Sequence, residues 1–169
     1  MGMRLFFAAL AASAASALLF AGCFQNSSPQ TSSFLPLTFP TNFESVRDCR
    51  LNVGHNGSYM DVWANPVAAP PYLAATYPLP AGSVVIAAQY GSDATCDGNS
   101  GIDASSYYVM AKEPSGYAPA ANDWRWQSLD AQHHILQDGQ LQTCISCHAN
   151  CAGGADSATT ATDYLCSRP

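Results

Sequence analysis

The residues best suited to chemistry lie in one short run, Cys144-Ile145-Ser146-Cys147-His148. Two cysteines separated by two residues and followed directly by histidine are the attachment motif of a c-type haem. On a helical turn the two thiols lie on one side, where they can add to the two vinyl groups at one edge of the porphyrin. Histidine is an ordinary proximal ligand of haem iron. The motif therefore predicts one covalent haem c, bound by Cys144, Cys147 and His148, with His148 on the iron.

Three alternatives compete with haem at this motif. A zinc ion would take Cys144, Cys147, His148 and Cys151, which is the right number of ligands in an unusually short stretch. A thioredoxin-like redox pair would need a strand-helix-strand frame, which the sequence does not indicate. A chance match is the third alternative, because the motif fixes only three residues. We favour haem, because the N-terminal sequence directs the chain to the place where c-type haem is attached.

The N-terminal residues are typical of a bacterial lipoprotein precursor. A short positive start ending at Arg4 precedes an apolar run over residues 5–21, and Ala21-Gly22 stand directly before Cys23. Small residues before a cysteine predict a signal peptide over residues 1–22 and lipidation of Cys23. A plain transmembrane anchor is the alternative, but the run is short for one. We therefore expect lipid anchoring in the cell envelope, on the periplasmic side. The outer membrane is favoured because no acidic residue follows Cys23.

The composition indicates one globular domain. Hydrophobic residues make up 48% of the 169 residues, which excludes a disordered chain. Twelve acidic residues outnumber six basic ones, for a net charge of −6. Nucleic-acid binders need a basic face, so that class is excluded. Residues 23–41 are rich in Ser, Gln, Asn, Thr and Pro, which predicts a flexible tether, and the domain is expected over residues 42–169.

The periodicity of the domain predicts strands joined by loops. We expect strands over residues 59–64, 83–90, 107–113 and 123–129, the first of them with Met60, Val62 and Ala64 on one face. Short helices are expected over residues 41–49 and 140–149, and the prolines of residues 65–80 would keep any helix there short. Strands and helices do not alternate regularly. The predicted fold class is therefore α+β, with a mainly antiparallel β-sheet and a few short helices.

The cysteines outside the haem motif and the lipidation site suggest disulfides, because an oxidising compartment is expected. These residues are Cys49, Cys96, Cys151 and Cys166. Four cysteines allow three pairings. We favour Cys151–Cys166, which would close the tail after the haem motif, and Cys49–Cys96, which would tie the first helix to the middle of the domain.

Several segments occur in an order that resembles the cytochrome P-460 family over residues 42–169. They are Trp63-Ala64-Asn65, Tyr72-Leu73, Pro80-Ala81-Gly82-Ser83-Val84-Val85-Ile86, Tyr108-Val109-Met110-Ala111-Lys112-Glu113, Gly116-Tyr117-Ala118-Pro119, Asp123-Trp124-Arg125-Trp126, the haem motif and Asp163-Tyr164-Leu165. The resemblance implies one c-type haem on a mainly antiparallel sheet, with His148 proximal and the opposite face of the iron open. It implies two activities, which are hydroxylamine oxidation and, as in the related beta-type cytochromes c-prime, binding of nitric oxide.

The resemblance also draws attention to lysine. The hydroxylamine-oxidising members cross-link a lysine to the haem, and the strand where that lysine is expected reads Ile86-Ala87-Ala88-Gln89 here. Lys112 is the one lysine of the chain. This departure from the pattern favours a binding or electron-transfer cytochrome over an oxidising enzyme.

The sequence leaves the sixth iron ligand open. The candidate ligands are His55, Met60, Met110, His133 and His134. Asp61 or Glu113 would be the proton acceptor that an oxidase needs.

Two function classes follow from the sequence. The first is a membrane-tethered monohaem cytochrome in electron transfer, with binding or oxidation of small nitrogen species at the iron. Its partners would be periplasmic or membrane electron-transfer proteins, and a homodimer is compatible with it. The second is a haem-free, disulfide-stabilised lipoprotein that acts as a binding or structural module.

Overall fold

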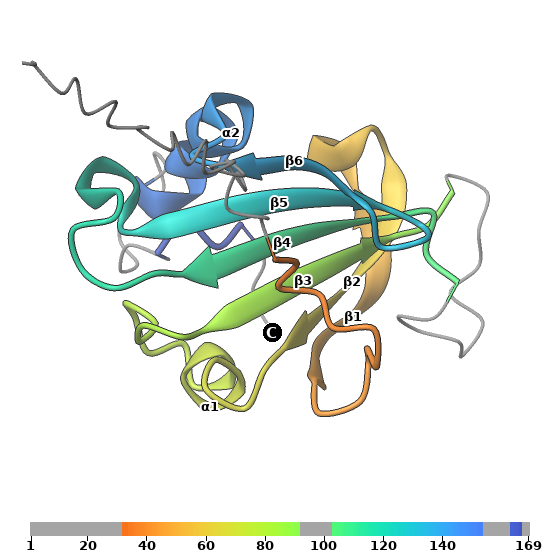
Figure 1. Cartoon of the computed structure of the whole chain (residues 1–169), viewed down its shortest axis with the longest axis horizontal. Helices are drawn as coiled ribbons and strands as arrows, with labels where there is room; N and C mark the ends of the chain where they lie inside the picture. Colours follow the sequence, from red (N-terminus) through yellow and green to blue (C-terminus); the bar gives the residue numbers. More distant parts are fainter. Residues whose placement is uncertain (1–31, 92–102, 154–162, 167–169) are drawn as a thin grey trace, which may run out of the picture. The chain divides into compact units, whose positions relative to one another are not determined.

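The computed structural model describes residues 32–91, 103–153 and 163–166, with the backbone alone for residues 151–153. In these segments six strands form one sheet (Figure 1). The strands are β1 (Glu44–Asn52), β2 (Ser58–Ala64), β3 (Val84–Gln89), β4 (Ser106–Lys112), β5 (Trp124–Asp130) and β6 (Ile135–Gly139). The helices are α1 (Ala69–Leu73) and α2 (Gln142–Gly153), with short 3-10 turns at Val53–His55 and Pro119–Ala121.

The sheet is an antiparallel meander in the order β1-β2-β3-β4-β5-β6. Each strand pairs with its neighbours in sequence, so no strand is skipped, although residues 65–83 and 90–105 are long connections. This confirms the predicted α+β class with a mainly antiparallel sheet. The four predicted strands correspond to β2, β3, β4 and β5, and the helix expected over 140–149 corresponds to α2. Helix α1, within the proline-rich stretch 65–80, is short, as the prolines there require.

The helix predicted over residues 41–49 is wrong, because this segment belongs to β1. Asn42 has a φ of 66°, whereas a helix N-cap needs an extended backbone. Arg47 lies opposite Val62, and Leu51 lies opposite Tyr59, with two register shifts along the ladder. These bulges break the period-2 alternation of β1, so the sequence pattern did not indicate a strand there. Strand β6 was missed because it is short and mostly polar.

Each face of the sheet carries its own apolar cluster. The face that carries α1 includes Val46, Val62, Ala64, Tyr72, Val85, Met110, Trp124, Trp126 and Leu165. The other face includes Leu35, Ile86, Ala88, Tyr90, Tyr107, Val109 and Leu129. Because both faces are covered, most residues of the four central strands β2–β5 are buried, and the clean alternation of a one-sided sheet is lost there.

The segment before β1 covers the second face of the sheet. Leu35 is only 2% exposed, and the Phe34 amide donates a hydrogen bond of 2.9 Å to Oε1 of Gln127. Nε2 of Gln127 donates to the Ser32 carbonyl at 3.0 Å. The compact unit therefore begins before residue 42, the predicted start of the domain. The predicted signal peptide, Cys23 and the first part of the tether lie outside the described residues. Within the described segments, no helix is long and apolar enough to cross a membrane.

Candidate functional site

The haem motif lies on α2, which packs against the α1 face of the sheet. Residues three and four positions apart share one side of a helix, and Cys144, Cys147 and His148 have this spacing. Leu141, Cys144 and Ile145 pack against the apolar cluster of the sheet. Cys144, Cys147 and His148 all line one pocket between α2 and the sheet. The structure thus brings together the three residues that the motif assigned to haem.

The pocket has an apolar floor built from four neighbouring strands. The floor residues are Met60, Val62, Val85, Ala87, Met110 and Trp126. The ladders set them in cross-strand rows, because Val62 lies opposite Ala87, and Val85 and Trp126 both lie opposite Met110. The pocket encloses about 790 Å³ of empty space, part of it open to solvent. Such a floor suits a flat, mainly apolar ring.

His148 is prepared for ligation through one ring nitrogen. Its Nδ1 lies 2.7 Å from the carbonyl oxygen of Tyr164. A carbonyl only accepts, so Nδ1 carries the proton and donates it, which leaves the Nε2 lone pair available for a metal. Burial lowers the pKa of His148 and so favours its neutral form, which is the ligating form, although the Tyr164 bond acts in the opposite direction. Hydrogen bonding at the second nitrogen is usual for metal-ligating histidines.

The two motif cysteines differ in their surroundings. Cys144 is a half-buried free thiol, and burial raises its pKa, with Cys147 contributing a smaller rise. Cys147 is exposed at the same pocket. Both cysteines thus line the pocket, and Cys144 is the more buried of the two.

Cys49 and Cys166 each take part in a disulfide bond. Cys166 also lines the pocket. The side chains of the expected partners, Cys96 and Cys151, lie outside the described residues, so the two pairings stay predictions. Cys49 lies on strand β1, whereas the sequence placed it at the end of a helix.

Arg47 is a buried cation at the pocket. Its side chain lines the pocket, and the residue is 8% exposed. Nη2 donates to the Met60 carbonyl at 3.0 Å, whereas Nε has no hydrogen-bond partner in the described part of the chain. Nε1 of Trp126, another lining residue, is likewise buried without a partner there. Buried donors of this kind normally have an acceptor. A ring with carboxylate substituents would supply both the acceptor and the missing negative charge.

The candidate sixth ligands separate into two groups. His55, Met60 and Met110 line the pocket, and the His55 ring packs 4.7 Å from the ring of Tyr108. His133 and His134 are not lining residues. His134 Nδ1 lies 2.9 Å from Asp130 Oδ2, and the His133 ring packs against Tyr107 on the second face.

Burial lowers the pKa of His55, and His148 and Arg47 lower it further. The electrostatic influence of His148 on His55 agrees with their shared pocket. His55 is therefore the imidazole to consider as a second iron ligand.

Lys112 is engaged away from the pocket. Its Nζ forms an ion pair with Oδ1 of Asp163 at 2.7 Å, and it is not among the lining residues. The two candidate proton acceptors do not line the pocket either. Asp61 is buried on the second face, where it accepts from the Tyr90 hydroxyl at 3.1 Å, and Glu113 pairs with Arg125.

Sequence reasoning missed two features of this site. Arg47 stood in a segment assigned to a helix, so nothing in the pattern directed it to the pocket. The carbonyl of Tyr164 is a backbone group, and residue type gives no indication of its role. The only sequence signal for this part of the chain was the resemblance, in which Asp163-Tyr164-Leu165 is the last matching segment.

No protein-family model matches the chain, and comparison with curated proteins finds no match. The resemblance to cytochrome P-460 therefore rests on the residues quoted above. Within the described residues, no group of three or more His, Cys, Asp or Glu side chains is arranged to hold a metal ion. The zinc alternative would thus depend on Cys151, whose side chain lies outside them.

Proposed function

We propose that this protein is a monohaem c-type cytochrome that transfers electrons and binds small nitrogen species, such as nitric oxide, at its iron. One observation carries the proposal. Cys144, Cys147 and His148 line a single apolar pocket, with the Nδ1 of His148 bonded to the Tyr164 carbonyl and Nε2 left for a metal. A chance cysteine motif would not require this arrangement.

The residues of the pocket would divide the work of binding haem. Cys144 and Cys147 would attach the ring covalently, and His148 would ligate the iron. The apolar floor would exclude water from one face of the ring, while Arg47 would pair with one of its carboxylates. The bound haem supplies one-electron redox chemistry and an iron coordination site, and the chain sets access to that site.

The position of Lys112 favours electron transfer and ligand binding over cross-link-dependent oxidation. Its ammonium group is bound to Asp163, outside the pocket. The floor residues on β3 are Val85 and Ala87, and neither side chain offers a nucleophile. The pocket is partly open, and the lipidated Cys23 would keep the domain near membrane or periplasmic electron carriers.

The test is expression of the mature chain together with the haem-attachment machinery. Intact mass and visible spectra would be recorded in the oxidised and reduced states, with and without carbon monoxide. The expected result is a mass gain of one haem and a reduced spectrum that carbon monoxide shifts. Cys144→Ala/Cys147→Ala should abolish covalent colour, and His148→Ala should retain colour with an altered spectrum. Ser146→Ala is the matched control, because Ser146 is exposed inside the motif and bonds only locally to Thr143.

Two outcomes would overturn the proposal. A folded wild-type protein without haem would favour the binding-module alternative. Colour that survives acid-acetone extraction of the double cysteine variant would show that the haem is attached elsewhere. If carbon monoxide does not change the haem spectrum, the protein would still be a cytochrome, but the proposed ligand binding at its iron would be wrong. This result would point to His55, Met60 or Met110 as the sixth ligand.

A further inference from the structure

The C-terminal segment Asp163–Cys166 forms one wall of the pocket. Leu165 is 3% exposed and lines the pocket, and the Tyr164 carbonyl bonds to His148. Asp163 and Tyr164 have φ values of 52° and 64°. Two successive residues with side chains in the left-handed region have a strained backbone. The segment therefore needs strong contacts to keep the carbonyl where His148 meets it.

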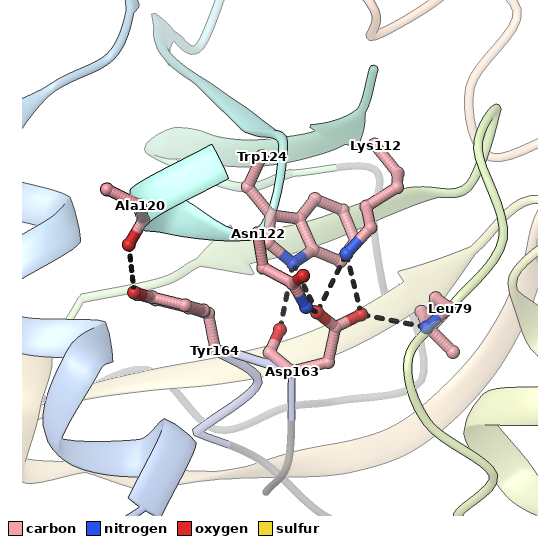
Figure 2. Close-up of polar contacts among 7 residues, drawn as sticks. All are labelled: Leu79, Lys112, Ala120, Asn122, Trp124, Asp163 and Tyr164. Carbon is pink, nitrogen blue, oxygen red and sulfur yellow. Dashed lines mark hydrogen bonds and ion pairs between the residues drawn. The ribbon is translucent and has the colours of Figure 1, made fainter. Parts of the chain in front are cut away.

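Asp163 supplies those contacts (Figure 2). Lys112 Nζ lies 2.7 Å from Oδ1 and 3.0 Å from Oδ2, and the Leu79 amide donates to Oδ2 at 2.8 Å. Asn122 also donates to Oδ1. Trp124 Nε1 donates to the Asp163 carbonyl at 2.8 Å. Donors from four residues in three separate segments of the chain thus converge on one residue.

These donors join the segment to the sheet. Lys112 ends strand β4 and Trp124 begins β5, and the two are register partners. The Lys112 ammonium also lies 4.7 Å from the centre of the Trp124 ring. The side chains of Lys112 and Asp163 are 8% and 1% exposed. Tyr164 adds a further anchor, because its hydroxyl donates to the Ala120 carbonyl at 2.7 Å (Figure 2).

A buried ion pair is a weak source of stability, because desolvation offsets much of the attraction. Its value lies in fixing geometry. Here the fixed element is the backbone of Asp163 and Tyr164, and the Tyr164 carbonyl accepts the hydrogen bond from Nδ1 of His148. Lys112 and His148 are therefore linked by two hydrogen bonds of 2.7 Å, one to Asp163 and one to the Tyr164 carbonyl, and by the backbone that joins these two residues.

We propose that Lys112 and Asp163 are positioning residues for the proximal histidine: their ion pair holds the Tyr164 carbonyl on Nδ1 of His148 and so sets how strongly His148 donates to iron. The inference rests on the proposed function, since it requires His148 to be the iron ligand. A stronger bond at Nδ1 makes the imidazole a better donor, which stabilises ferric over ferrous iron and keeps the reduction potential low.

The size of the effect follows from comparable sites. Loss of an outer-shell partner typically changes metal affinity 10–100-fold. A tenfold loss of the ferric preference corresponds to a potential about 59 mV higher for a one-electron couple. We expect at least this shift when the ion pair is broken.

The experiment measures the reduction potential of the haem-loaded protein for Lys112→Met, Asp163→Asn and Trp124→Phe. Through-space electrostatics alone predicts opposite shifts for the first two, because loss of a positive charge lowers the potential and loss of a negative charge raises it. Positioning predicts a rise for both, since both release the Tyr164 carbonyl. Trp124→Phe changes no charge, and it removes the Nε1 donor together with part of the buried indole ring, so it should raise the potential as well. Asp138→Asn, which breaks the ion pair with Arg125, is the matched control and should leave the potential close to wild type.

The outcomes separate this inference from the proposed function. A wild-type protein without haem would overturn the proposed function and this inference with it. Haem-loaded wild type, with Lys112→Met at or below the wild-type potential, would overturn only the positioning role. If a charge variant fails to fold, Trp124→Phe decides, because an unchanged potential there shows that the contacts of Asp163 do not reach the iron.

Discussion

Replacing Leu35 by alanine should destabilise the domain by about 2–3 kcal/mol, whereas Leu37→Ala should change stability by less than about 0.5 kcal/mol. The two leucines stand two residues apart in the segment that the composition assigned to a flexible tether. Leu35 is 2% exposed beneath the second face of the sheet, and Leu37 is 89% exposed. The pair therefore measures whether the segment is part of the folded domain.

The magnitude follows from the burial of Leu35. The substitution removes three carbons, at about 0.8 kcal/mol for each buried CH₂ group. A residual cavity would add to this loss, and fully enclosed leucines reach about 5 kcal/mol. Leu35 lies in an irregular segment, which can move toward the gap, so the cavity contribution should be small. The segment stays attached through Gln127, whose amide bonds to Ser32 and Phe34 are independent of the leucine side chain.

Urea unfolding of both variants, in the same haem state as wild type, checks the prediction. Tryptophan fluorescence is a suitable probe, because the Trp63 ring lies 5.7 Å from the ring of Phe39 in the same segment. With a urea dependence of about 2 kcal/mol per molar, the midpoint for Leu35→Ala should fall by roughly 1–1.5 M. Equal midpoints for the two variants would refute the reasoning and restore the flexible tether.

Three further predictions concern pH, the sheet edge and the pocket. In haem-free folded protein the pKa values of His148 and His55 lie below the unfolded value of about 6.5. As the pH falls, these histidines therefore take up protons in the unfolded chain before they do so in the folded one. The free energy of unfolding should consequently fall as the pH drops below about 6.5. Urea midpoints from pH 7.5 to 5.5 check this, and a flat profile would contradict it. Arg125→Ala should cost only about 1 kcal/mol in urea unfolding, because its pair with Asp138 on β6 is partly exposed, and a loss above about 3 kcal/mol would contradict this. His55→Ala should leave haem content unchanged and speed carbon monoxide binding in flash photolysis, because it clears a ring from the pocket, and slower binding would contradict the open iron site.

The strands on the pocket side could be predicted from local pattern. Met60, Val62 and Ala64 alternate with the residues that face the second cluster, and the structure places all three on the α1 face or at the pocket. The motif on α2 was predictable for the same reason, since its geometry depends on spacing within one helix. The position of the pocket between α2 and the sheet was not, because it depends on contacts between distant segments.

The failures have a common physical cause. In β1 two register shifts disturb the alternation, and in residues 32–41 burial of Leu35 depends on a surface formed by other strands. Serine- and proline-rich composition predicts weak local structure, and the segment indeed has no strand or helix. Its order comes instead from the amide of Gln127, which is 1% exposed beneath it. A sequence window does not contain that contact, since the residues are more than ninety positions apart.

The chemistry of the pocket depends on strand register as much as on the residues themselves. On β2, β3 and β4 the row that faces the pocket contains Val62, Ala87 and Tyr108, which are cross-strand partners. A slip of one residue on β2 would replace Val62 by Asp61 and place a buried carboxylate under the ring. The ladders that pair β2 with β1 and β3, and the covered second face, where Asp61 accepts a bond from Tyr90, both oppose that slip. The second face therefore contributes to function without touching the pocket, because it fixes which side of each strand the haem would meet.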